Sequence, residues 1–205
     1  MARGEGDHGA ALVETALITP ILLVLLLAIF EYGILFRDKL TTTNAVTDAT
    51  KFGAIQGPVL TPGGASADYT VVNLARQNLA AIPPSWIKRV VVFKAGPSGL
   101  GDPLSQVPAA CKTATSSSAG CNVYLVPEAF IQIEAGNTDY FKCGGPYTIA
   151  CGWDPQNRRN GPKVGNVEYL GVYIEISRPE FSNLIPKTER LEVAAIQRLE
   201  PGQLS

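Results

Sequence analysis

The sequence predicts an α+β protein. A long N-terminal transmembrane helix continues as an amphipathic stem, and an antiparallel β-sheet packed on one or two helices follows, with disulfide-tied loops. Three observations predict this fold class. Residues 10–36 form an apolar run with only two charged side chains, Glu14 and Glu31. Residues 169–177 alternate between apolar and polar side chains, as a half-buried strand does. The four cysteines form two close pairs, which favours disulfides in a domain beyond a membrane helix.

The apolar run is long enough to cross a bilayer. As a helix it would measure about 40 Å at roughly 1.5 Å per residue. Glu14 and Glu31 would lie near opposite edges of the hydrocarbon, where a carboxylate costs several kcal/mol unless it is paired, neutral or near the interface. A Sec signal peptide, an ordinary single-pass anchor and a buried core helix are the alternatives. The bulky residues after the run and its lack of a polar face count against the first and the last.

Pro20 lies inside the predicted membrane helix. Proline removes one helical hydrogen bond and clashes with the preceding turn, so a kink or a short melted segment is expected there. Transmembrane helices tolerate such a residue. Two interpretations stay open, an inert kink and a feature that helps the helix to leave the membrane.

The start of the apolar run carries a motif. Gly9 is followed directly by the hydrophobic Ala10, and Glu14 is the fifth residue after the glycine. This spacing resembles the class III signal peptide of the type IV pilin superfamily, which a prepilin peptidase cuts after the glycine. Residues 13–36, VETALITPILLVLLLAIFEYGILF, resemble the TadE-like proteins of the tight-adherence (Flp) pilus system, which pair a V-E-x-A-L-x-x-P core with a later E-x-G. The likeness is close over residues 9–53 and returns at residues 194–201.

The resemblance implies a minor pilin or pseudopilin that takes part in pilus assembly and is processed between Gly9 and Ala10. The new α-amino group on Ala10 would lie about one helical turn from Glu14, and their pairing would set the register between neighbouring subunits. The implied partners are other pilins or pseudopilins, the prepilin peptidase, an inner-membrane assembly platform and the membrane itself. The alternative is a membrane-anchored extracellular binding or adhesion module that is not processed.

Four segments follow from this interpretation: a leader at 1–9, a transmembrane helix at 10–36, an amphipathic stem at 37–57 and a globular domain at 58–205. In the stem, apolar residues are expected near one face, and Gly57 and Pro58 end the helix. These apolar residues are Leu40, Ala45, Val46, Ala49 and Phe52. The N-terminus is expected in the cytoplasm and the domain outside the cell membrane, with entry into a surface pilus left open. The balance of Lys and Arg around the span favours the opposite orientation, but the cysteines and the domain size favour this one.

The domain is expected to contain a second helix at residues 68–81, capped by Ser66 or Asp68 and stopped by two prolines. Strands are expected at residues 86–94, 123–126, 130–134, 169–177 and 191–200, forming a half-buried antiparallel sheet. Two inserts, residues 96–120 and 136–167, interrupt the sheet as long loops.

The cysteine pairs are Cys111 with Cys121 and Cys143 with Cys151; the first pair spans the end of the first insert, with Cys121 directly after it, and the second pair lies within the second insert. Three pairings are possible, and the local one, which closes two short loops, is favoured. Zinc is the rival interpretation, but no C-x-x-C occurs and the single histidine, His8, lies in the leader. No metal site is therefore predicted.

The second insert is also a candidate binding loop, because it carries four residues of types that often anchor interfaces. They are Tyr147, Trp153, Arg158 and Arg159. The alternative, which is slightly favoured for the aromatic residues, is that they cover a small satellite core under the disulfide.

The composition excludes several functions. The net charge of −1 argues against a nucleic-acid partner, which would favour a basic face. With no histidine beyond the leader, a Ser-His-Asp or Cys-His site in the domain is excluded. No Walker A, G-x-S-x-G or G-x-G-x-x-G motif occurs, so the sequence predicts a structural protein that is not an enzyme and needs no cofactor. An anchored hydrolase with paired carboxylates is the least favoured alternative, because the acidic residues of the domain show no distinctive arrangement.

Overall fold

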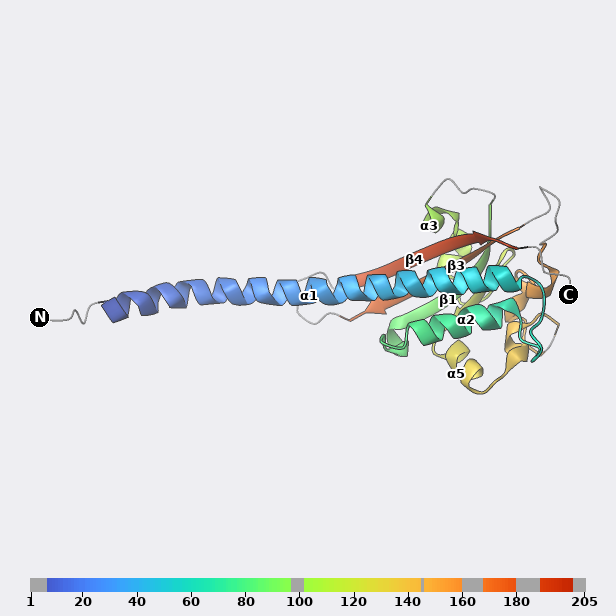
Figure 1. Ribbon diagram of the computed structural model, residues 1–205, viewed down its shortest axis with the longest axis horizontal. Coiled ribbons are helices and arrows are strands. Elements are labelled where there is room, and N and C mark those ends of the chain that lie inside the picture. The colour runs from blue at the N-terminus through green and yellow to red at the C-terminus, as the bar shows by residue number, and fades with distance from the viewer. Residues whose placement is uncertain (1–6, 97–101, 145, 160–167, 180–188, 201–205) are drawn as a thin grey trace, which may run out of the picture. The chain divides into compact units, whose positions relative to one another are not determined.

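The computed structural model describes residues 7–96, 102–144, 146–159, 168–179 and 189–200. The chain divides into two units, residues 1–38 and 39–205, and each is described by itself. The first unit consists of the N-terminal part of α1 (Asp7–Gln56), which is helical without interruption through Pro20 (Figure 1). The expected melted segment at Pro20 is therefore absent from this helix.

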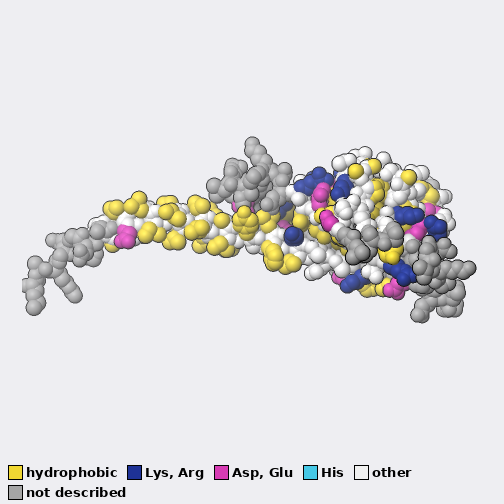
Figure 2. All heavy atoms as spheres, turned by 90° about the horizontal axis from the view of Figure 1, so that it is seen from above, with side chains coloured by type: hydrophobic (Ala, Val, Ile, Leu, Met, Phe, Trp, Pro, Cys, Tyr) yellow, Lys and Arg dark blue, Asp and Glu magenta, His cyan; other side chains and the backbone are white. Residues whose placement is uncertain are grey.

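The apolar half of α1, residues 9–36, exposes large hydrophobic side chains on all sides. Leu12 and Ile29 are 72% and 71% exposed, and yellow hydrophobic atoms cover most of the visible face in Figure 2. The helix is long and apolar enough to cross a membrane, and its most apolar 18-residue stretch has a mean hydropathy of 2.5 and no buried residue. One N-terminal apolar helix thus fits a single-pass anchor.

The second unit is built on a four-stranded antiparallel sheet in the order β2-β1-β3-β4. The strands are β1 (Ile87–Ala95), β2 (Cys121–Leu125), β3 (Tyr169–Arg178) and β4 (Glu189–Arg198), and β1 has an irregularity opposite β3 between Ile87 and Arg89. The helices are α2 (Ala67–Asn78), α3 (Pro103–Gln106), α4 (Ala109–Thr113) and α5 (Glu128–Glu134). Short 3-10 turns are η1 (Pro84–Trp86), η2 (Thr138–Phe141), η3 (Ile149–Cys151) and η4 (Pro155–Asn157). The α+β class is confirmed.

One face of the sheet is covered by α2, α5 and the packed part of α1, residues 39–56, with α2 beside α1 in Figure 1. Small residues on α1 allow a close approach, since a Cβ on Gly53 would lie 2.4 Å from Val71 Cγ2. The stem prediction is right for the three central positions, which are buried, but wrong for two others. Leu40 and Phe52 are 48% and 54% exposed, whereas Thr42 and Thr50 are buried, so the inner face of α1 is shifted from the predicted one and includes polar residues.

The other face of the sheet is also buried, which corrects the expected half-buried sheet. Phe93 and Tyr173 are fully buried there, under Val107 and the Cys111–Cys121 disulfide. The segment that covers them contains α3 and α4 and belongs to the insert expected as a plain loop. Its Ser- and Gly-rich composition hid the two residues, Val107 and Cys111, that reach the sheet.

Residues 130–134 were predicted as a strand and instead form part of α5. Ala129, Phe130 and Ile133 are buried, and this spacing places them on one face of a helix. A short apolar run does not distinguish strand from helix by periodicity alone. Here Pro127 precedes the run, and the helix packs on α2, with Arg76 bonded to Glu134 at 3.1 Å.

Candidate functional site

The candidate assembly motif lies in the first turns of α1. Gly9 and Ala10 are both helical, and Gly9 is exposed, with no atom within 4 Å of an added Cβ. Glu14 is four residues after Ala10, and side chains at this spacing lie on one face of a helix. Glu14 is exposed and makes no hydrogen bond or ion pair with the residues that the structure describes. The motif thus presents a carboxylate one turn away from the predicted cleavage point.

Next to Glu14, the helix carries two other polar side chains that the structure describes, and both are bonded within the helix. The hydroxyl groups of Thr15 and Thr19 donate to the carbonyls of Ala11 and Thr15, both at 2.7 Å. Because these hydroxyls are satisfied within the helix, they add little polarity to its surface. Glu14 therefore stands out chemically on an otherwise apolar stretch of helix.

The candidate binding loop is closed by the Cys143–Cys151 disulfide, with the two Cα atoms 4.7 Å apart. Its four predicted residues are not gathered on one exposed surface. Tyr147 is half-buried and stacks edge-on against Tyr140, with ring centroids 5.2 Å apart. Trp153 and Arg158 do meet, with the guanidinium 4.1 Å from the ring, but Arg158 is only 2% exposed.

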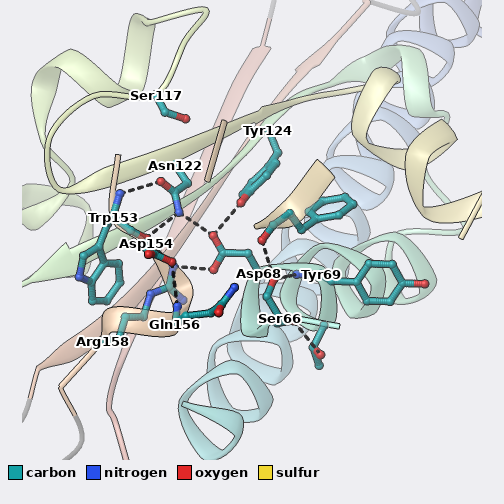
Figure 3. A network of polar contacts seen from close by, with 12 residues as sticks. Ser66, Asp68, Tyr69, Ser117, Asn122, Tyr124, Trp153, Asp154, Gln156 and Arg158 are labelled. Carbon is teal, nitrogen blue, oxygen red and sulfur yellow. Dashed lines mark hydrogen bonds and ion pairs between the residues drawn. The ribbon is translucent and has the colours of Figure 1, made fainter. Parts of the chain in front are cut away.

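Arg158 belongs to a buried polar network (Figure 3). Its Nη2 atom lies 2.6 Å from Asp68 Oδ1, and Asp68 Oδ2 accepts hydrogen bonds from Tyr124 Oη and Asn122 Nδ2, both at 2.7 Å. Asn122 also exchanges two hydrogen bonds with the backbone of Trp153, at 2.8 and 2.9 Å. The network links α2, β2 and residues 153–158 of the candidate binding loop, which gives these side chains a structural role.

The ionisation of Tyr124 fits this role. Burial, followed by the nearby carboxylate of Asp68, raises the pKa of Tyr124 well above its usual value of 10.0. The phenol therefore stays protonated and donates a hydrogen bond to Asp68. The sequence indicated only that Asp68 or Ser66 could cap a helix and that Arg158 lies in a long loop, so the pairing of Asp68 with Arg158 was missed; the cap is Ser66.

Arg159, the fourth predicted loop residue, is exposed and bonded to Glu168. Its backbone N–H donates to Glu168 Oε2 at 3.0 Å, while Lys94 Nζ donates to Oε1 at 2.8 Å. Burial acts to raise the pKa of Glu168, but the hydrogen bonds from Lys94 and Arg159 outweigh it and hold the pKa below 4.5. Arg159 is thus engaged within the domain.

Other chemistry is sparse. Across the part of the chain that the structure describes, no group of three or more His, Cys, Asp or Glu side chains is placed to hold a metal ion. An apolar groove of about 240 Å³ lies between α2 and α5. Its lining includes Leu79, Ile82, Pro84, Pro127 and Ile131, with Arg76 and Glu134 among its polar residues.

Comparison with known proteins gives one match. Residues 9–51 match the family model described as TadE-like protein. The match begins at the glycine of the assembly motif and ends within the packed part of α1. No curated protein and no solved structure matches the chain.

Proposed function

We propose that this chain, whose residues 9–51 support its recognition as a TadE-like protein of the tight-adherence pilus system, is a minor pilin or pseudopilin of that system. The family match suggests involvement in the pilus system, and it is the observation that carries the proposal. It covers the apolar half of α1 together with both elements of the motif, Gly9 and Glu14. TadE-like pilus components are generally non-enzymatic structural proteins, so the proposed role is in assembly.

In this proposal a prepilin peptidase removes residues 1–9 and leaves an α-amino group on Ala10. Glu14 is exposed and has no partner among the described residues, so its carboxylate is available to that amine in its own or a neighbouring subunit. A charged pair of this kind is stronger in an apolar environment than in water. The pair would therefore favour one register of the subunit against its neighbour.

The proposed location is the cell membrane. Residues 10–36 would span it once, residues 37–57 would form the stem, and residues 58–205 would lie outside the cytoplasm. The exposed apolar side chains of α1 support the span, and the two disulfides support an oxidising compartment for the domain. Other pilins or pseudopilins and an inner-membrane platform are the proposed partners.

A Glu14→Ala variant tests the assembly role. A charge-assisted hydrogen bond contributes about 1.5–3 kcal/mol, so removing it should lower the amount of the protein recovered with sheared pili by roughly tenfold to a hundredfold. The variant should still be processed after Gly9, because the cleavage point is unchanged. Immunoblots of the sheared and membrane fractions give both readouts.

Thr15→Ala is the matched control, since it removes the neighbouring side chain, whose hydroxyl bonds only within the helix. This variant should assemble normally. Normal assembly of Glu14→Ala, or an equal defect in Thr15→Ala, would contradict the proposal that Glu14 sets the register between subunits.

A further inference from the structure

The domain has two ends, which the direction of α2 distinguishes. The Thr70 hydroxyl at the start of α2 bonds to Gln56, and Asn78 at its end bonds to Asp48 at 3.3 Å. Therefore α2 runs antiparallel to α1, and its last turn points toward Lys39, where the chain enters the second unit. We call this the entry end of the domain. It includes η1 and the first residues of β1.

Trp86 and Lys88 lie at the entry end. Trp86 is half-buried on η1, directly after the exposed Pro84 and Ser85, and the Arg178 guanidinium lies 5.8 Å from its ring centroid. Lys88, two residues later, is exposed, as is Lys39 on α1. Neither lysine forms an ion pair with a described residue.

At the opposite end of the domain, several basic side chains form ion pairs. Lys94 and Arg159 there both pair with Glu168, and Lys142 pairs with Asp139 at 3.0 Å. Lys51, on α1 toward that end, is exposed and has no ion pair with a described residue, so the entry end is distinguished by the combination of its lysines with Trp86 and not by the lysines alone. These side chains are accompanied by the apolar groove beside η1, whose Ile131 is 53% exposed.

A tryptophan, unpaired lysines and exposed aliphatic surface are the components of proteins that bind the interfacial region of a membrane. Lys39 follows the apolar run by only three residues, so the entry end is the part of the domain closest along the chain to the bilayer. We propose that the entry end docks on anionic phospholipid headgroups of the membrane that α1 enters. This proposal rests on the membrane anchoring in the proposed function.

The chain's two tryptophans allow a direct test, because they mark opposite ends of the domain. Trp153 bonds to Asn122, which bonds to Asp68 at the start of α2, so it lies away from the entry end. Trp153→Phe leaves Trp86 as the reporter, and Trp86→Phe leaves Trp153. Each full-length variant is placed in nanodiscs that contain lipids with a spin label on the headgroup.

Quenching of Trp86 is expected in discs that contain phosphatidylglycerol, with little quenching of Trp153. A basic residue near an anionic surface contributes enough for about a fivefold change in the ratio of docked to undocked domain, so Lys39→Glu or Lys88→Glu should lower that ratio by at least this factor. High salt or purely zwitterionic discs should lower it as well. Equal quenching of the two tryptophans, or quenching of Trp86 that ignores lipid charge and salt, would overturn the proposal.

Lys51→Glu is the matched control. It makes the same charge change on the same helix, twelve positions from Lys39 and toward the other end of the domain, and should leave the quenching unchanged. Insertion is scored separately, by recovery of the chain with the discs. If α1 does not insert, the anchoring in the proposed function fails, and quenching by preformed vesicles of the same lipids decides the docking on its own.

Discussion

Side chains of the same kinds differ in burial and in bonding between the two units. In the apolar half of α1, most large aliphatic residues are more than half exposed, as at Leu12, and Glu14 has no partner among the described residues. In the domain, Leu79 and Ile174 are fully or almost fully buried, and the carboxylate of Asp68 is bonded to three side chains. The domain completes its own interactions, whereas the apolar half of α1 needs lipid or other subunits to complete them.

The family match crosses this division. It covers the incomplete region and most of the packed part of α1, and it ends before α2 begins. The likeness to TadE-like proteins therefore includes the exposed apolar half of α1 together with most of the stretch of α1 that packs in the domain. Changes in the domain should affect stability, and changes near Glu14 should affect assembly.

The largest effect on stability is expected from the buried ion pair. Asp68→Leu or Arg158→Met removes one member and leaves the other charge buried without its partner, which costs about 3–5 kcal/mol. The double variant should cost less than the sum of the single variants, because no charge is left alone. Urea unfolding of the full chain in detergent, followed by circular dichroism, measures the three values.

The control for this series is a surface pair. Lys142→Ala breaks the ion pair with Asp139, which is 64% exposed, and should cost at most about 1 kcal/mol. If the buried variants cost no more than Lys142→Ala, the network does not hold the loop to α2 as described.

A smaller effect is expected from two glycines on the same helix. Gly53→Ala places a methyl group 2.4 Å from Val71 Cγ2 and should destabilise the domain by about 1–3 kcal/mol. Gly33→Ala meets nothing within 4 Å and should be neutral or gain up to about 1 kcal/mol of helix propensity. Thermal unfolding of both variants compares them, and equal changes would contradict the division between the two parts of α1.

The smallest effect concerns pH. The pKa of Glu168 is lower in the folded domain than its usual value of 4.5, so its contribution to stability is present above that value. This contribution is lost as the pH falls from 4.5 through the lower folded-state pKa. Glu168→Gln should therefore reduce the acid sensitivity of unfolding in this window while leaving the rest of the pH profile similar. An unchanged profile would show that, in solution, Lys94 and Arg159 do not lower the pKa of Glu168.

Much of the fold could be predicted because local patterns determine it. The apolar run of α1 and the alternation in β3 each follow from one segment of sequence, and both elements are observed. The family resemblance could also be recognised from local residues, since Gly9 and Glu14 are only five positions apart. The misassigned α5 shows the limit, because its burial depends on packing against α2.

The features that the sequence did not reveal join distant segments. Asp68 and Arg158 are ninety positions apart, and neither residue type indicates its partner. Likewise, Val107 reaches the second face of the sheet from a segment whose composition is typical of a loop. Because the sequence did not reveal the pairing with Asp68, Arg158 was predicted as a candidate binding residue, whereas the structure places it in the interior.

The N-terminal residue of the mature protein tests the central claim most directly. The protein is isolated from membranes and analysed by intact mass and terminal sequencing. The account predicts that the mature chain begins at Ala10, so that its amine lies one turn from Glu14. A chain that still begins at Met1 or Ala2 would leave Glu14 without this partner, contradict prepilin processing and favour a membrane-anchored binding module that is not processed.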